Sequence, residues 1–373
     1  MARGASPEIR FMREALKLAR RGYGMTSPNP IVGAVLVKAG KIVGRGFHQR
    51  VGRPHAEIEA LRDAEARGHS ARDATLYVTL EPCCTHGRTP PCTDAIIAAG
   101  IRQVIVGAID PNPKHSGRGL EVLRAARVKV RDGVLAPEAT RLNETFNHWI
   151  VHRTPFVTVK AGMSLDGKIA TRTGESKWIT SPPSRERAMR LRQGADAILV
   201  GANTILRDDP SLTVRLAGIS KPLRRFILDS KARTPLSCKV VADDSASFTT
   251  IVVGPDAPSK KVNALQRKVQ VWSAPLRKGS IDLRWLLKKL GSENVTSLLV
   301  EGGGEVNASF LLGGFSHRIA FFYAPILIGG ADAVKAVAGG GIMDAAKGLK
   351  LNDVEWERIG PDLLLNARLE RPN

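Results

Sequence analysis

The chain has 373 residues, more than twice the usual size of a single domain, so two domains are expected. Its 43% hydrophobic and 24% charged residues exclude a largely disordered or collagen-like protein. The net charge of +21 raises a nucleic acid or another anionic partner as a hypothesis. The charge is spread along the chain, with +9 in residues 1–150 and +12 in the remainder, and only 5% of residues are aromatic. Nucleic-acid binding is therefore not favoured, whereas a small phosphorylated substrate and cofactor would suit a positive field.

The sequence carries no signal for export or for a membrane. Residues 1–22 lack the apolar core and the cleavage site of a signal peptide. The longest apolar run, residues 319–331, contains Pro325 and is shorter than the roughly 20 residues of a membrane-spanning helix. Four cysteines are too few and too clustered for a secreted disulfide framework, which indicates a reducing compartment and metal binding. We expect a cytoplasmic protein that makes no membrane contact and forms a homo-oligomer, a common state of such proteins.

The first half alternates helices and strands. Residues 8–21 repeat apolar side chains at a helical period, and residues 31–37 and 42–43 are β-branched runs joined by a Gly-containing turn. Further along, the expected helices are residues 55–66, 93–99 and 119–126, and the expected strands are residues 75–80, 102–108 and 128–130. This alternation predicts an α/β domain with a largely parallel sheet.

A domain boundary is expected near residues 147–156, where Pro155 precedes a new β-run, and we assign domains 1–147 and 148–373. The second domain is expected to be α/β as well. Its expected helices are residues 185–193, 283–290 and 305–312, and its expected strands are residues 156–160, 197–200, 226–228, 250–253, 269–272 and 297–300.

A histidine, a glutamate and two cysteines of the first half match a zinc deaminase site. A catalytic zinc site takes three protein ligands and leaves the fourth position for water. His55, Cys83 and Cys92 meet that count, so one zinc ion per chain is expected. Zinc lowers the pKa of bound water to about 7, and Glu57, two residues after His55, is placed to carry the proton to the departing amine. The pattern H-x-E followed by P-C and a second cysteine is typical of zinc nucleobase deaminases.

The cysteine spacing departs from that pattern, because eight residues rather than two separate Cys83 from Cys92. Adjacent side chains diverge, so Cys83 and Cys84 are not the ligand pair, and Cys84 is interpreted as a packed or exposed thiol. A structural zinc site would need a fourth protein ligand, for which His86 is the obvious candidate. His48 is interpreted as a loop histidine, with a place near the site left open.

The second half lacks the G-x-G-x-x-G fingerprint of the usual dinucleotide-binding fold. Instead, a strand leads into Gly302, Gly303 and Gly304 and then into a helix. Free backbone N–H groups and the helix dipole at such a place suit a cofactor phosphate. A tight turn that needs glycine for positive φ would explain these residues equally well.

The motifs of the first half resemble those of a known enzyme family, the bifunctional riboflavin-biosynthesis deaminase–reductases. The matching segments are SPNPIVGAVLV at residues 27–37, HAE at 55–57, TLEPCCTHGRTPPC at 79–92 and DPNP at 110–113. The eight-residue spacing between the cysteines is characteristic of that branch of the zinc deaminases. The resemblance implies an α/β, cytidine-deaminase-like three-layer domain, and it implies that Asn29 and the loop from His86 to Arg88 help to bind a ribosyl phosphate.

The second half resembles the reductase domain of the same family, so the resemblance covers nearly all of residues 8–367. The matching segments are KAGMSLDG at residues 160–167, GESKWIT at 174–180, GANT at 201–204, RDDPSLT at 207–213 and EGGG at 301–304. The implied fold is similar to dihydrofolate reductase, and the implied cofactor is NADPH. The implied NADPH contacts are Gly162, Trp178, Thr204, Asp208, Ser230, Gly303, Gly304, Glu305, Val306, Asn307, Ala308 and Ser309. The implied contacts to the ribose-phosphate substrate are Ser176, Arg192, Leu212, Arg215 and Glu301, with the two arginines as forked phosphate donors.

The resemblance thus implies a bifunctional enzyme of riboflavin biosynthesis. The zinc domain would deaminate 2,5-diamino-6-(5-phosphoribosylamino)pyrimidin-4(3H)-one at C2, and the second domain would reduce the ribosyl side chain to ribityl with NADPH. Three alternatives stay open at this point. They are a nucleic-acid base deaminase with a basic binding surface, a non-enzymatic protein stabilised by zinc, and an enzyme with only one working half.

Overall fold

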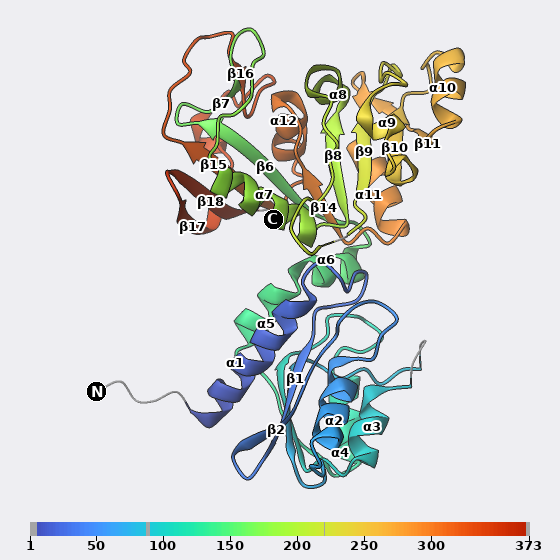
Figure 1. Cartoon of the computed structure of the whole chain (residues 1–373), viewed down its shortest axis with the longest axis vertical. Helices are drawn as coiled ribbons and strands as arrows, with labels where there is room; N and C mark the ends of the chain where they lie inside the picture. Colours follow the sequence, from blue (N-terminus) through green and yellow to red (C-terminus); the bar gives the residue numbers. More distant parts are fainter. Residues whose placement is uncertain (1–5, 87–89, 220, 371–373) are drawn as a thin grey trace. The chain divides into compact units, whose positions relative to one another are not determined.

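The computed structural model describes residues 6–86, 90–219 and 221–370. The chain forms two compact units, Met1–Arg153 and Thr154–Asn373, each with its own sheet (Figure 1). Helix α6 (Glu144–His152) runs across residue 147, so the sequence-based boundary falls inside a helix that groups with the first unit. No helix among the described residues is long and apolar enough to span a bilayer.

The first unit is built on a five-stranded sheet with the order β2-β1-β3-β4-β5. Its strands are β1 (Gly33–Lys38), β2 (Lys41–Phe47), β3 (Thr75–Leu80), β4 (Gln103–Ala108) and β5 (Lys129–Arg131), and its other helices are α1 (Pro7–Ala19), α2 (Ala56–Ala66), α3 (Cys92–Ala98), α4 (Arg118–Ala125) and α5 (Ala136–Leu142). Strands β3, β4 and β5 are parallel, whereas β1 is antiparallel to both of its neighbours. The expectation of a largely parallel sheet was therefore wrong for β1 and β2. Ala39 and Gly40, both at positive φ, form a tight hairpin that places β2 antiparallel to β1.

Alternate residues of β1 pack on opposite faces of this sheet. Leu36 joins a core cluster with Ala60 of α2, while Val35 joins a second cluster with Met12 of α1. Helices α2, α3 and α4 cover the first face, and α1 and α5 cover the other (Figure 1). Because a strand points successive side chains to opposite faces, the β-branched run at residues 31–37 needs helices on both sides. The expected three-layer architecture is confirmed.

Gly46 of β2 sets how closely α2 approaches the sheet. A Cβ atom at this position would lie 2.1 Å from the carbonyl oxygen of Ala56 and 2.4 Å from the amide nitrogen of Ala60. No larger residue fits without displacing the helix. The start of α2, where His55 is the N-cap residue, is therefore held directly against β2.

The second unit is built on a nine-stranded sheet with the order β11-β10-β9-β8-β14-β6-β15-β18-β17. Neighbours from β11 to β15 are parallel, and β18 and β17 add an antiparallel edge. The strands are β6 (Phe156–Ser164), β8 (Ala197–Gly201), β9 (Arg224–Leu228), β10 (Thr249–Val253), β11 (Gln270–Ser273), β14 (Ser297–Val300), β15 (Arg318–Ala324), β17 (Leu351–Ile359) and β18 (Asp362–Leu369). The helices are α7 (Pro182–Gly194), α8 (Ala202–Asp208), α9 (Lys239–Ala242), α10 (Ser259–Gln266), α11 (Leu283–Ser292) and α12 (Gly304–Leu312). Helices α11 and α12 contribute to the core on one face, and α8, α9 and α10 contribute to the core on the other.

The elements expected from periodicity are present, with ends shifted by a few residues, and the structure adds several that were not expected. The largest omission is β15, which takes the first half of the apolar run at residues 319–331 and pairs with β6 in the middle of the sheet. A strand buried on both faces has no polar alternation to mark it. Helices α5, α6 and α8 and the hairpin of β17 and β18 were also missed.

Candidate active sites

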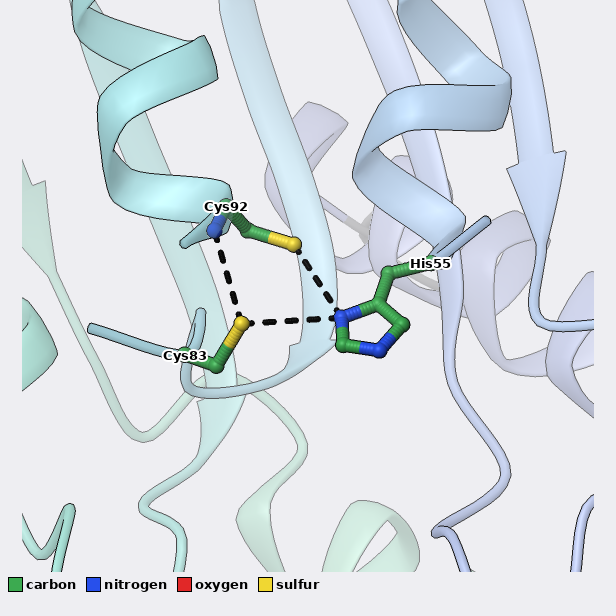
Figure 2. A group of neighbouring side chains, drawn as sticks. All are labelled: His55, Cys83 and Cys92. Carbon is green, nitrogen blue, oxygen red and sulfur yellow. Dashed lines mark hydrogen bonds between the residues drawn. The ribbon is translucent and has the colours of Figure 1, made fainter. Parts of the chain in front are cut away.

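The three predicted zinc ligands lie together beyond the carboxyl end of β3 (Figure 2). His55 is the N-cap of α2, Cys83 follows β3, and Cys92 is the first residue of α3. Nδ1 of His55 lies 3.5 Å from Sγ of Cys83 and 3.3 Å from Sγ of Cys92, and the three atoms are all within 4.8 Å of one another. Because one imidazole and two thiols converge in this way, the donor set fits a zinc ion with an open fourth position.

The electrostatics of the two cysteines favour one thiolate before any metal binds. A hydrogen bond from the Cys92 thiol lowers the pKa of Cys83, and the neighbouring His55 ring acts in the same direction. The same interaction raises the pKa of Cys92. The backbone N–H of Cys92 also donates to Sγ of Cys83, at 3.4 Å. Since the thiolate is the form that binds metals, Cys83 is prepared as a ligand.

Glu57 lies in the first turn of α2, and only 3% of its surface is exposed. Burial raises the pKa of Glu57 to about 7, and the negative charge of Cys83 adds to this effect. A cation bound by the three ligands would act in the opposite direction and favour the carboxylate. The residue thus sits beside the predicted metal without belonging to the ligand group.

A cavity of about 270 Å³ opens onto these groups. His55, Glu57 and Cys83 line it, together with Asn29, which was predicted from the family resemblance to bind substrate. Helix α6 contributes Phe146, Trp149 and Ile150 to the lining. These three apolar residues have the i, i+3, i+4 spacing of a helix face, which is a signal for α6 that the sequence itself carries.

His48 is a further cavity residue that was interpreted as a loop histidine. It is 2% exposed, and its ring packs edge-on against His55 with the centroids 5.4 Å apart. Nδ1 lies 3.1 Å from the carbonyl oxygen of Pro54, so Nδ1 donates, and Nε2 accepts from the side-chain amide of Asn29 at 3.2 Å. Burial lowers the pKa of His48, which agrees with this neutral ring. His48 therefore orients Asn29. The loop that holds His48 has no periodic pattern, so the sequence did not indicate this role.

The DPNP loop reaches the same cavity through Asp110, Asn112 and His115. The buried carboxylate of Glu81 organises this loop, because it accepts hydrogen bonds from three backbone N–H groups. They belong to Asp110, Gly117 and Gly119, at 3.1, 2.9 and 2.9 Å. Glu81 belongs to the matched segment at residues 79–92, but its partners lie 29, 36 and 38 residues away along the chain, and only the fold identifies them.

The neighbours of Cys83 fall outside the ligand group. Cys84 is half-buried, and its sulfur lies 3.6 Å from Nδ1 of His115. His86, predicted to bind phosphate, is exposed. Arg88, predicted for the same role, lies outside the described residues. The roles of His86 and Arg88 stay predictions.

In the second unit, two of the predicted substrate residues are bonded to each other. The guanidinium group of Arg192, on α7, donates to both carboxylate oxygens of Glu301, at 2.8 and 3.0 Å, and to the carbonyl oxygen of Thr213 at 3.0 Å. Nζ of Lys160, on β6, lies 3.6 Å from the same carboxylate. Burial by itself raises the pKa of Glu301, but Arg192 and Lys160 outweigh it and lower this pKa to about 2. The arginine fork, which was expected to point at a phosphate, is thus engaged within the protein.

The other predicted substrate residues differ in their surroundings. Ser176 donates from its hydroxyl to Asp208, at 3.3 Å. Leu212 is buried in the core at positive φ, and Arg215 is exposed. Ser176 is therefore bonded to Asp208, a predicted cofactor contact, and Arg215 is accessible to a ligand.

The predicted cofactor residues gather at the carboxyl ends of adjacent parallel strands. Thr204 and Asp208 follow β8, Ser230 follows β9, and the residues from Gly303 to Ser309 follow β14. Such an edge is the usual ligand site of a parallel α/β sheet. Gly303 is the N-cap of α12 and has no side-chain capping bond, so the first N–H groups of the helix suit a cofactor phosphate.

Gly162 and Trp178 are the two predicted cofactor residues outside this group, and Asn307 within it has a bond of its own. Gly162 is in β6, and its missing Cβ would lie 3.2 Å from the side chain of Thr180. Trp178 is 69% exposed, and Cζ of Arg185 lies 4.5 Å from the centroid of its ring. Asn307 is fully buried and donates to the carbonyl oxygen of Ala336, at 2.8 Å. Asn307 therefore has a structural partner already, while Trp178 offers an open aromatic face.

The two units match two different family models. Residues 5–108 match the cytidine and deoxycytidylate deaminase zinc-binding region, and residues 155–365 match the RibD C-terminal domain. The chain is 46% identical to the riboflavin biosynthesis protein RibD of Aquifex aeolicus over 355 residues, which is 95% of this chain and 96% of that one. It is 39% identical to RibD of Escherichia coli over 95% of this chain and 98% of that protein.

Solved structures agree over the whole chain. Acinetobacter baumannii RibD, form 1, superposes with a TM-score of 0.86 at 32% identity, covering 98% of this chain and 99% of that one. A diaminohydroxyphosphoribosylaminopyrimidine deaminase/5-amino-6-(5-phosphoribosylamino)uracil reductase from Thermotoga maritima gives a TM-score of 0.83 at 36% identity, with the same coverage. Both units of the chain therefore have their counterparts within a single polypeptide in these relatives.

Proposed function

Because the chain belongs to the RibD family of riboflavin-biosynthesis proteins and is a bifunctional deaminase and reductase, we propose a specific substrate, cofactor and residue set for each half. The first unit would deaminate 2,5-diamino-6-(5-phosphoribosylamino)pyrimidin-4(3H)-one. The second would reduce the ribosyl side chain of the product to ribityl. The comparisons do not favour the alternative of a nucleic-acid base deaminase.

The deaminase half uses zinc, and we propose one ion per chain held by His55, Cys83 and Cys92. When bound, the zinc ion would activate a water molecule for attack on the ring carbon that carries the amino group. Glu57 would take a proton from that water and deliver it to the leaving nitrogen, so that water and the amino-pyrimidine become a carbonyl and ammonia. The observation that carries the proposal is that Glu57, His55 and Cys83 line a single cavity, while the sulfur of Cys92 lies within 4.8 Å of the ligand atoms of His55 and Cys83.

The other cavity residues would bind the substrate. Asn29, held by His48, has its side-chain carbonyl available for the amino groups of the pyrimidine. Trp149 and Phe146 offer apolar surface for the ring. His86 and Arg88 are proposed for the ribosyl phosphate, as the family motif implies.

The reductase half uses a nicotinamide cofactor, and we propose NADPH. Its phosphates would lie at the start of α12, against Gly303 to Ser309, and Gly162, Trp178, Thr204, Asp208 and Ser230 would complete the site. The nicotinamide would supply the hydride, so these residues need only hold the nicotinamide ring against the opened sugar. The sugar phosphate would meet Ser176, Leu212, Arg215 and the pair of Arg192 and Glu301.

One time course tests the proposal. Zinc-loaded protein receives the diaminopyrimidinone ribosyl phosphate and NADPH, and ammonia release and the loss of NADPH absorbance are followed together. We expect ammonia first and NADPH oxidation second, with one zinc per chain by elemental analysis. Oxidation of NADPH before any ammonia is released would contradict the proposed order, and the absence of both signals would overturn the proposed substrate.

A further inference from the structure

We propose that Asn143 is a positioning residue of the deaminase, because it holds the loop of Asn29 to the start of α6 and so sets the space that is left for the pyrimidine ring. The proposal rests on the deaminase function given above. Asn143 is 2% exposed, lies between α5 and α6, and is not among the residues that line the cavity. It would therefore act through the groups that it holds.

The lining of the cavity combines two segments from distant parts of the chain. One segment is the loop at residues 28–32, which we call the cavity loop. It contributes Asn29, both neighbouring prolines and Val32. The other segment is α6, which contributes Phe146, Trp149 and Ile150. A substrate ring in the cavity would meet polar groups of the first segment and apolar groups of the second.

Asn143 joins these segments by two hydrogen bonds to the backbone of Ile31. The side-chain carbonyl of Asn143 accepts from the N–H of Ile31, at 2.7 Å, and its side-chain amide donates to the carbonyl oxygen of Ile31, at 2.9 Å. Neither backbone group of Ile31 has another hydrogen-bond partner in the described part of the chain. The pairing of β1 begins only at Gly33, so Ile31 lies outside the sheet. The amide of Asn143 therefore takes the place that a neighbouring strand would have.

The side chain of Asn143 is engaged by the loop rather than by its own helix. Asn143 is the N-cap residue of α6, and its backbone carbonyl accepts from the N–H of Asn147 at 2.8 Å. Asparagine is among the preferred N-cap residues because its side chain can accept from the first N–H groups of a helix. The side chain of Asn143 makes no such bond. This indicates a role other than starting the helix.

The link bears on the substrate through Asn29, which lies two residues before Ile31. The N–H of Asn29 donates to the carbonyl oxygen of Thr26, at 2.8 Å, and its side chain bonds to His48. Those contacts hold Asn29 within its loop, whereas the bonds of Asn143 hold the loop to α6. A pyrimidine ring that bonds to Asn29 while it packs on α6 needs both groups at a fixed separation. Asn143 fixes that separation.

Loss of the link should weaken substrate binding and spare the chemistry. The predicted zinc ligands and Glu57 belong to α2, α3 and the end of β3, not to the cavity loop or to α6. A substitution that removes only binding raises KM and leaves kcat unchanged. Asn143→Leu has nearly the size of the native residue and removes both hydrogen bonds. We expect the KM of ammonia release from the diaminopyrimidinone ribosyl phosphate to rise about tenfold, with kcat within about threefold.

Thr79→Val is the matched control. The hydroxyl of Thr79, which is fully buried, accepts from the N–H of Gly33 at 3.1 Å. T79V therefore also leaves a buried N–H of this segment unpaired, two residues beyond Ile31, but it does not touch the link to α6. Thermal unfolding should show a loss of stability in both variants, while the KM of T79V stays within about twofold of wild type. If N143L does not fold, N143A is measured in its place, because it leaves room for water at the backbone of Ile31.

Zinc content and reductase activity are measured on the same samples. We expect one zinc ion per chain in every variant and unchanged NADPH oxidation with the deaminated ribosyl phosphate, since the reductase is the other unit. An unchanged KM in N143L, or an equal rise in N143L and T79V, would overturn the proposal. So would loss of zinc or a fall in kcat at constant KM, because Asn143 would then support the metal site. Wild-type protein that releases no ammonia would overturn the proposed deaminase substrate itself.

Discussion

Arg192 and Glu301, 109 residues apart, are joined by two hydrogen bonds between one guanidinium group and one carboxylate. The pair is nearly buried, with 11% and 10% of the two side chains exposed, and Lys160 adds a second positive charge. Removing one member of such a pair leaves an uncompensated charge in a site of low dielectric constant. Substitutions at either residue will therefore change the stability of the second unit as well as any contact with substrate.

Glu301→Gln should make the stability of the second unit less dependent on pH. The pKa of Glu301 is about 2 in the folded chain, below its ordinary value of 4.5. Its stabilising contribution is therefore complete above about pH 5 and is lost as the pH falls from there toward 2. The free energy of unfolding should differ by about 3 kcal/mol between wild type and E301Q at pH 7, and the difference should shrink between pH 5 and 3. Calorimetric unfolding at several pH values measures it.

Glu186→Gln is the matched control, since Glu186 pairs with Arg190 on the exposed face of α7. Surface pairs of this kind contribute roughly 0.5 kcal/mol, so its effect should be small at every pH. A difference between wild type and E301Q that stays constant from pH 7 to pH 3 would contradict the assigned pKa.

Glu57→Gln should abolish deamination without loss of zinc. The amide has the size of the carboxylate but cannot accept and return a proton, which costs about 10² to 10⁴ in rate for a general acid–base group. Ammonia release and zinc content are measured on the same samples. Glu59→Gln changes a half-buried glutamate of the same helix that lies outside the cavity, and it should retain full activity. An active E57Q protein would remove Glu57 from the proposed proton transfer.

Cys83→Ser and Cys84→Ser should separate the metal ligand from its neighbour. Because Sγ of Cys83 faces His55 and that of Cys84 faces His115, only the first substitution removes a converging donor. We expect zinc content to fall from one ion per chain to a small fraction in C83S and to stay at one in C84S. Elemental analysis after dialysis provides the measurement, and the reverse result would exchange the two assignments.

Gly46→Ala should loosen the zinc site through the backbone. The added methyl group would lie 2.1 Å from the carbonyl oxygen of Ala56, so α2 must move and carry His55 with it. We expect a loss of about 3 kcal/mol of stability in the first unit and weaker retention of zinc. Gly52→Ala is the comparison, because its Cβ would meet no atom within 4 Å and only the positive φ of 81° is unfavourable, at about 1 kcal/mol. An equal loss of stability in G46A and G52A would contradict the role given to the close packing of α2 against Gly46.

Sequence alone was sufficient where the signal is local. The period of apolar residues predicted helices such as α1 and strands such as β3, because burial on one or two faces leaves its mark within a few residues. The three residues that the fold brings together as candidate zinc ligands, and Glu57 beside them, could also be found from the sequence, since the chemistry of a zinc deaminase requires particular side chains in a recognisable motif. That motif and those of the second half carried the family assignment, which the comparisons confirmed.

Tertiary structure decided everything that depends on contacts between distant segments. The order of the nine strands, the carboxylate of Glu81 on the DPNP loop and the hydrogen bond from Asn29 to His48 join residues that no local pattern relates. The fold also turned Arg192, predicted as a phosphate donor, into the partner of Glu301. Residue type sets what a side chain can bond to, but its partner is whichever group the packed chain brings within about 3 Å.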